Sequence, residues 1–207
     1  MDRFRIGILI VMTLISSSCF SQTKTRENEI PFYFPIEKNS NLDNNVKLDK
    51  FLNTWYSEQL FALNEPILFS GQVADKSAYR MTVLRTFANP FTMRIENDND
   101  TITLYWKECD GSGGYEPGNL IKDKKVRLTI EDWKTIEKYI AEIDFWNLPT
   151  LDKDEDSPPD GTTWVLEGLK AGRYNVITMW NPEKVDVFKI FSFLVNLTDI
   201  DYKKKRD

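Results

Sequence analysis

Two short runs of alternating apolar and polar residues constrain the fold more than any other feature of this chain. Every second residue is apolar in residues 91–96 and again in residues 101–107. A period of two is typical of a β-strand with one buried face. The Asn and Asp residues at 97–100 favour a tight turn between the runs, because both residue types tolerate left-handed backbone. The pattern therefore predicts an antiparallel hairpin.

Further periodic segments surround this hairpin. Strands are predicted near 79–83 and 126–128 and over 164–169 and 174–180, and the last two are joined by the turn Lys170-Ala171-Gly172. Helices are predicted over 46–60, from Thr129 to Ile143 and from Asn181-Pro182 to Thr198. This order predicts one α+β domain over residues 46–200, with a mostly antiparallel sheet of about six strands and about three packed helices.

The helix predicted over 46–60 has a candidate buried face and a candidate cap. The apolar residues fall near helical spacing, and Asn44 or Asn45 can cap the first turn. The second helix has Thr129 followed by Asp132 at the capping spacing. The expected buried face of the first helix comprises Leu48, Phe51, Leu52, Trp55 and Leu60. That of the third comprises Phe188, Phe191, Leu194, Val195 and Thr198.

The first 21 residues have the order of a signal peptide. A short charged start precedes an uncharged apolar run at 6–15, and small residues follow. The run is about half of the roughly 20 residues that a bilayer-spanning helix needs. Two cleavages are open: before Gln22, which gives a free secreted form, or before Cys19, which leaves that thiol lipidated. We expect export to the periplasm or the medium, or a lipid anchor at Cys19.

The segments that flank the domain are polar. Residues 22–45 are expected to be a linker whose apolar stretch, Ile30 to Ile36, docks in part on the domain. Residues 201–207 contain a basic run and are expected to be a frayed tail. The whole chain has a net charge of −5, so we expect no nucleic-acid partner and membrane contact only through an N-terminal lipid.

Residue usage excludes several kinds of active site. The chain has no histidine, which removes histidine-based nucleophile pairs, histidine general bases and histidine-ligated zinc. After cleavage before Gln22, Cys109 is the one remaining cysteine, so an internal disulfide cannot form. Cys109 is expected to be buried as a small hydrophobe, since Glu108 and Asp110 oppose formation of a thiolate. No cofactor is expected.

Four strings of residues resemble an uncharacterised family of bacterial exported proteins without an established activity. The strings are Leu84-Arg85-Thr86-Phe87, Gly113-Gly114-Tyr115-Glu116-Pro117-Gly118, Phe145-Trp146-Asn147-Leu148-Pro149 and Asp160-Gly161-Thr162-Thr163-Trp164-Val165-Leu166-Glu167-Gly168. The resemblance covers residues 79–198 and supports the existence of the domain. Relatives often carry histidines at places that hold Ala88, Asn89 and Asn175 here. The family implies no established reaction, so the resemblance transfers no catalytic residue.

Carboxylates are the remaining candidates for chemistry. Asp152, Asp154, Asp156 and Asp160 alternate as in a calcium-binding loop, but Ser157 and Thr163 stand where the helix-loop-helix form needs Gly and Glu, so a solvated acidic loop is the simpler interpretation. Glu167 lies on a predicted strand, and Glu108, Glu116 or Asp160 would have to lie beside it for a glycosidase-type pair. No catalytic or metal-ligating residue is assigned.

Two further features are candidates for binding. Within the glycine-rich segment 109–118, the residues Asp110 to Gly114 could hold an anion on backbone N–H groups. They lack the ending and the following helix of a phosphate loop, so a mobile hairpin connection is the simpler interpretation. Trp146 and Trp180 lie near the ends of their elements and could contact a glycan. The other tryptophans of the predicted elements, Trp55, Trp106, Trp133 and Trp164, are expected in the core.

These observations predict a non-catalytic exported domain that binds an envelope or extracellular protein, or an accessory protein of the envelope. The alternative is a histidine-free enzyme that acts through carboxylates, with or without calcium. The two differ in what they require: an enzyme needs carboxylates that converge in a pocket, whereas a binding domain needs an exposed apolar patch.

Overall fold

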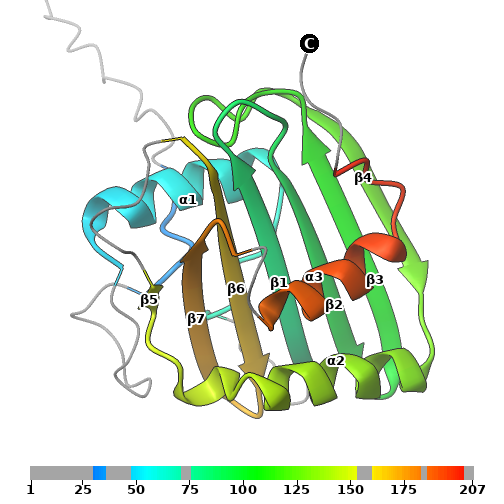
Figure 1. Cartoon of the computed structure of the whole chain (residues 1–207). Helices are drawn as coiled ribbons and strands as arrows, with labels where there is room; N and C mark the ends of the chain where they lie inside the picture. Colours follow the sequence, from blue (N-terminus) through cyan, green and yellow to red (C-terminus); the bar gives the residue numbers. More distant parts are fainter. Residues whose placement is uncertain (1–29, 36–47, 71–75, 153–159, 183–185, 203–207) are drawn as a thin grey trace, which may run out of the picture.

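A computed structural model describes residues 30–35, 48–70, 76–152, 160–182 and 186–202 (Figure 1). The fold is α+β, with a sheet in the order β4-β3-β2-β1-β6-β7-β5. Six long strands form the antiparallel part, and the short β5 pairs with β7 in parallel. The strands are β1 (Lys76–Arg85), β2 (Phe91–Asp98), β3 (Thr101–Cys109), β4 (Leu120–Arg127), β5 (Leu151–Asp152), β6 (Thr162–Lys170) and β7 (Arg173–Trp180). The predicted fold class is confirmed.

The predicted hairpin turns form as expected. Between β2 and β3, Asn99 and Asp100 have φ values of 49° and 61°. Between β6 and β7, Ala171 and Gly172 have φ values of 49° and 75°. Left-handed backbone at both central positions matches the twist of the flanking strands, so two-residue turns close both hairpins.

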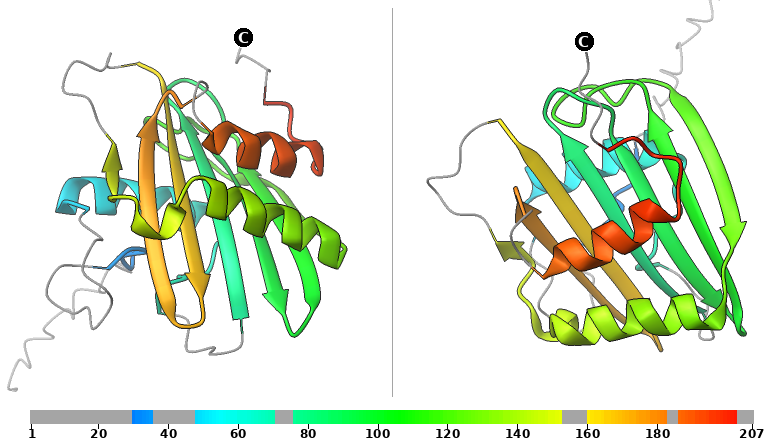
Figure 2. Two further views of the ribbon diagram at one scale, coloured as in Figure 1. Left: turned by 60° about the horizontal axis from the view of Figure 1, so that its bottom comes forward. Right: turned by 45° about the vertical axis from the view of Figure 1, so that its right-hand side comes forward.

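Helices cover both faces of the sheet. The helices α2 (Ile130–Glu142) and α3 (Val187–Asn196) lie on one face, and α1 (Lys50–Ala62) lies on the other (Figures 1 and 2). A single turn of 3-10 helix, η1 (Phe145–Asn147), follows α2. The α2/α3 face holds the larger apolar core, which includes Tyr79, Met93, Leu104, Trp164 and Phe191.

The face beneath α1 is more polar. Apolar residues such as Leu60, Val165 and Val176 pack there together with Tyr33 and Phe34 from residues 30–35. Strand alternation places the second set of β1 and β2 side chains on this face, and that set includes Arg80 and Arg94. The sheet therefore separates an apolar core from a layer that contains buried charges.

The helix boundaries require two corrections. The first helix is capped by Asp49, whose side chain accepts a hydrogen bond from the Leu52 N–H; Asn44 and Asn45 lie outside the described residues. The third helix begins at Val187 rather than at Asn181-Pro182, since Asn181 has φ 46° and ends β7 in a turn. The predicted Thr129–Asp132 capping box at the second helix is confirmed.

The predicted inward faces of two helices are also partly wrong. In α1, Phe51 is 75% exposed, whereas Asn53, Tyr56, Ser57, Gln59 and Leu60 are buried. The helix packs on a partly polar layer, so its buried face contains polar side chains that find hydrogen-bond partners in that layer. The Asn53 amide, for example, donates to the Phe34 carbonyl. In α3, Val187 and Ile190 are buried with Phe191 and Leu194, and Phe188 is 36% exposed.

Candidate functional site

Glu167, the strand carboxylate singled out in the sequence, lies buried beneath α1. It stands opposite Arg80 in the β1–β6 register. The Arg80 Nε–H donates to Glu167 Oε2 at 2.7 Å, and the Tyr174 hydroxyl donates to Glu167 Oε1 at 2.9 Å. Both oxygens of the carboxylate are therefore occupied by neighbouring protein groups.

A second fully buried carboxylate, Glu65, lies in the segment that follows α1. Its Oε2 accepts from Arg94 Nε at 2.7 Å and lies 3.4 Å from Arg80 Nη1, and its Oε1 lies 3.3 Å from Lys107 Nζ. Arg94 also pairs with Glu96. We call these six residues, Arg80, Arg94, Lys107, Glu65, Glu96 and Glu167, the ion-pair network; it contains equal numbers of cations and anions.

The network attaches the segment after α1 to three strands. The Arg80 guanidinium donates to the Pro66 carbonyl at 2.7 Å, and the Lys107 ammonium donates to the Asn64 carbonyl at 2.5 Å. The Tyr33 hydroxyl donates to the Glu65 carbonyl at 2.9 Å, which connects residues 30–35 to the same place. Buried charges are tolerated only when they are paired and hydrogen-bonded, and this arrangement meets that condition.

The electrostatics of the network follow from burial. Burial raises the pKa of the Glu167 carboxyl above its usual range, and Arg80 and the Tyr174 hydroxyl oppose that change. Burial, reinforced by the nearby Glu167 charge, raises the pKa of Tyr174 well above 10.0. Since Glu65 and Glu167 are fully buried, no substrate reaches them without displacing the packed segment. The geometry is that of a structural connection.

The acids that the sequence suggested as partners of Glu167 do not belong to this network. Glu108 lies opposite Phe91 in the β2–β3 register, which places it on the α2/α3 face, where it contacts Asn89 and Lys122. Glu167 is on the other face of the same sheet. Glu116 and Asp160 are exposed on loops. A glycosidase-type pair of Glu167 with Glu108 is therefore excluded by the register.

The remaining metal and lipid candidates fall mostly outside the described residues. Asp154 and Asp156 of the acidic loop lie there, as does Cys19, and Asp160 is exposed. Within the described ranges, no group of three or more cysteine or acidic side chains is arranged to hold a metal ion.

Cys109 is buried at the end of β3, as predicted. The strand has an irregularity between Glu108 and Cys109, and the Cys109 N–H donates to the Pro90 carbonyl at 3.0 Å. Burial, with smaller contributions from Asp110 and Glu108, raises the pKa of the Cys109 thiol to about 11. A thiol in this environment is neither a good nucleophile nor a good metal ligand.

The Cys109 thiol leads to a prediction about alkaline pH. Its pKa is raised from 9.0 to about 11 in the folded protein, so the native state favours the protonated form. The resulting stabilisation is complete below pH 9.0 and is lost as the pH rises toward about 11. We expect the free energy of unfolding, measured by urea titration, to fall across that interval. The fall should be smaller in Cys109→Ala; an identical slope in both proteins would contradict this assignment.

The glycine-rich loop after β3 packs tightly against the protein. The N–H groups of Gly111, Ser112 and Gly113 donate to the carbonyls of Pro117, Glu116 and Ala88. A Cβ atom added at Gly113 would lie 2.6 Å from the Leu84 Cα, and one at Gly114 would lie 2.9 Å from the Thr86 Cα. These N–H groups are used within the protein, so the loop does not have the arrangement of an anion-binding loop.

Side chains from α1 hold the same loop in place. The Trp55 indole N–H donates to the Gly113 carbonyl at 3.1 Å, and the Gln59 amide donates to the Tyr115 carbonyl at 2.8 Å. The four strings noted in the sequence also meet in space: the Thr86 N–H donates to the Gly161 carbonyl, and Gly168 packs against Phe145. The strings therefore supply a backbone hydrogen bond at one place and the packing of a glycine against an aromatic ring at another.

Gly113 offers a direct test of this packing. We expect Gly113→Ala to destabilise the protein by about 1–3 kcal/mol, because the new methyl group collides with backbone atoms that cannot rotate away. Thermal unfolding measures the effect, and Gly172→Ala is the comparison for added bulk, because no atom lies within 4 Å of that site. Gly172 has φ 75°, so this control itself carries backbone strain. A Gly113→Ala effect below about 1 kcal/mol would contradict the packing described.

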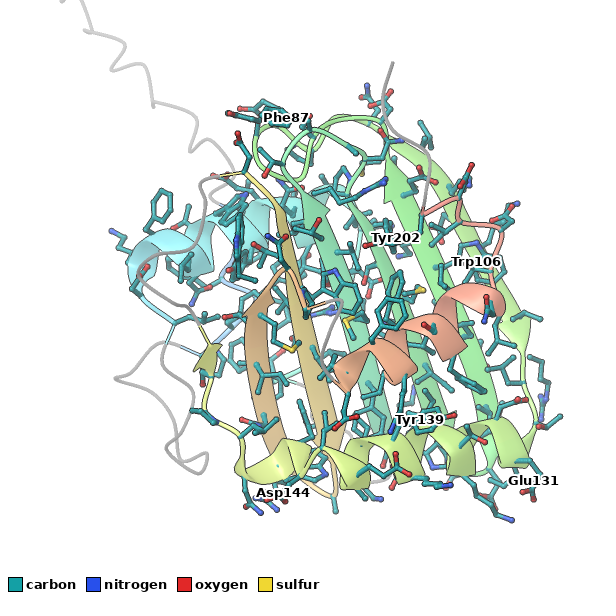
Figure 3. All side chains as sticks on the ribbon, viewed as in Figure 1. Phe87, Trp106, Glu131, Tyr139, Asp144 and Tyr202 are labelled. Atoms are coloured by element: carbon teal, nitrogen blue, oxygen red, sulfur yellow. The ribbon has the colours of Figure 1, made fainter. Side chains whose placement is uncertain are left out.

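An exposed aromatic pair joins this tightly held loop to the connection between β1 and β2: Tyr115 lies on the loop, and Phe87 lies on the connection. Phe87 is 58% exposed and Tyr115 is 62% exposed, and their ring planes are inclined by 30° with centroids 6.1 Å apart. Phe87 lies at the end of the sheet opposite α2, on which Glu131 lies (Figure 3). Adjacent exposed aromatic rings are a candidate contact surface, because exposed apolar patches often mark interaction sites.

The aromatic pair continues onto α1. Trp55 is half-buried beside the loop, and Phe51 lies one helical turn before it on the same side of the helix. We call Phe51, Trp55, Phe87 and Tyr115 the aromatic surface. The sequence pattern missed it, because Phe51 was assigned to the buried helix face and no periodicity marks Phe87 or Tyr115.

The other tryptophans lie elsewhere. Trp106, Trp133 and Trp164 are buried on the α2/α3 face, as predicted, whereas Trp55 is only half-buried. Trp146 is half-buried beside Arg173, whose guanidinium carbon is 5.3 Å from the ring centroid. Trp180 is half-buried against Gly161. Neither Trp146 nor Trp180 belongs to the aromatic surface, and contact of these two residues with a glycan stays a prediction.

Comparisons with known proteins add no family. A scan against protein-family models and a search of curated proteins found no match to the chain. In the part of the chain that the structure describes, the helices are too short or too polar to cross a membrane.

Proposed function

We propose that this protein is a non-catalytic exported domain whose aromatic surface binds a protein of the envelope or the extracellular space. Residues 1–21 direct export, and the mature protein is periplasmic or extracellular, or anchored by a lipid at Cys19. The observation that carries the proposal is the exposed pair of Phe87, on the β1–β2 connection, and Tyr115, on the tightly packed loop after β3.

The chemistry of this surface suits a protein partner. Aromatic residues are enriched in the centres of protein interfaces and supply large contact areas with few rotatable bonds. The hydrogen bonds from Trp55 and Gln59 hold the loop before a partner arrives, which lowers the entropy cost of binding. The carboxylate enzyme is less well supported, because Glu167 is buried in an ion pair and Glu108 lies on the opposite face.

The proposal is tested with a tagged protein expressed in its own cell. Wild type, a Phe87→Ala/Tyr115→Ala double variant and a Phe61→Ala control are purified, and the associated proteins are quantified by mass spectrometry. Phe61 is also 50% exposed but lies outside the aromatic surface. We expect one partner in stoichiometric amounts with wild type and the control. The double variant should recover at least tenfold less of this partner, which corresponds to about 1.4 kcal/mol of binding free energy. Equal recovery with all three would refute the proposal.

A further inference from the structure

The strand β4 forms one edge of the sheet. It pairs with β3 and, within the described residues, with no other strand. Figure 1 and the right-hand view of Figure 2 show it at the outer rim of the molecule. Its sequence, LIKDKKVR, contains no proline or glycine. The pairing with β3 is irregular near Leu120 and regular from Lys122 to Arg127. That regular part of an edge strand presents backbone groups that another extended chain can pair with.

The register identifies which backbone groups point outward. The Leu128 N–H donates to the Ile102 carbonyl, and Leu104 lies opposite Val126. Residues of an antiparallel pair alternate between hydrogen-bonded and non-hydrogen-bonded positions. Lys124 and Val126 therefore direct their backbone groups toward β3. Asp123, Lys125 and Arg127 direct theirs away from the sheet, where they are open to an added strand.

The cations on one face of β4 have ion-pair partners, and those on the other face have none among the described residues. On the α2/α3 face, Lys122 pairs with Glu108 at 3.0 Å, and Lys124 pairs with Asp199. On the other face, Lys125 and Arg127 are exposed and have no ion pair among the described residues. The strand carries four cations and one acid in a chain with net charge −5, so its charge is opposite to that of the whole protein.

We propose that β4 is a docking edge for an extended segment of a partner protein that has acidic side chains at alternate positions. The acids would lie beside Lys125 and Arg127, because residues of adjacent strands face one another on the same side of the sheet. The side chains between the acids would lie beside Val126, which is 38% exposed, and beside Lys124, which is already paired; apolar residues fit there. A second copy of this chain fits poorly, since two β4 strands would bring their net positive charges together.

The docking edge shares no residue with the aromatic surface, although the two are close in the sequence. Tyr115 lies in the loop that connects β3 to β4, and β4 begins at Leu120. One partner could therefore contact both surfaces, yet each surface is removed by its own substitutions. Failure of one proposal leaves the other intact.

The experiment uses the purified full chain and a synthetic peptide in which glutamate and valine alternate. A second peptide has the same composition with the glutamates in one block. Hydrogen exchange reports the backbone, and fluorescence anisotropy of the labelled peptides reports affinity. We expect the alternating peptide alone to protect the amides of Asp123, Lys125 and Arg127 from exchange. Equal binding of both peptides, or no protection of these amides, would overturn the proposal.

Three variants distinguish peptide binding at β4 from attraction by the net charge of the protein. Lys125→Glu should weaken binding of the alternating peptide about fivefold, because it replaces an attractive cross-strand pair by a repulsive one. Lys134→Glu makes the same charge change on the exposed side of α2 and should leave binding within about twofold of wild type. Lys125→Pro removes an outward N–H while leaving the β3 ladder intact, and should abolish amide protection. Equal effects of Lys125→Glu and Lys134→Glu would show attraction by net charge only.

Discussion

Substitution of Glu65 by alanine is expected to destabilise the protein by about 3–5 kcal/mol, a large part of the stability of a typical domain. Glu65 is the shared anion of Arg80, Arg94 and Lys107. Its removal leaves buried cations with too few partners, and the desolvation cost of those cations is then not offset. Urea unfolding followed by circular dichroism measures the change.

Two comparisons make this prediction specific. Glu131→Ala removes an exposed acid that pairs with Lys134 on α2, and should change the free energy of unfolding by less than about 1 kcal/mol. The double substitution Arg80→Met/Glu167→Met removes both members of one buried pair and should cost less than the sum of its two single substitutions. A Glu65→Ala effect as small as that of Glu131→Ala would contradict the assigned role of the ion-pair network.

Substitution of Trp164 by alanine is the second change with a large expected effect, about 3–5 kcal/mol. Trp164 is fully buried on β6, and its ring centroid lies 4.3 Å from that of Phe191 and 6.1 Å from that of Phe188. The residue thus packs α3 against the sheet, and alanine would leave a cavity beneath the helix. Thermal unfolding measures the loss.

The matched control is Trp164→Phe. The indole N–H of Trp164 has no hydrogen-bond partner among the described residues, so phenylalanine loses packing volume alone. We expect less than half of the alanine effect, and α3 should retain its protection from hydrogen exchange. A phenylalanine variant as unstable as the alanine variant would show that the indole makes a contact beyond packing.

Local sequence patterns predicted the apolar side of this fold well. Alternation in residues 91–96 and 101–107 placed β2 and β3 correctly, because one face of each strand meets the apolar core. The Thr129–Asp132 cap was also predicted, since both partners lie within one helical turn. Such features depend on neighbours in the sequence and are therefore visible without the fold.

The polar side of the fold could not be predicted in the same way. Arg80 and Glu167 are 87 residues apart in the chain and meet only through the β1–β6 register. The face of α1 was predicted wrongly at Phe51 because apolar residues were assumed to face inward, whereas the layer beneath α1 takes Asn53, Ser57 and Gln59. Because Phe51 was assigned to the buried face, the aromatic surface was not predicted from the sequence.

The most direct test of the proposed function is photo-crosslinking in the native cell from single positions of the aromatic surface. A photoreactive phenylalanine analogue is introduced at Phe87 and, as the control, at Phe61, which is 50% exposed and lies outside the aromatic surface. We predict one discrete crosslinked protein from position 87 and none from position 61. The same crosslinks from both positions, or none from either, would contradict the assignment of the aromatic surface as the site of partner binding.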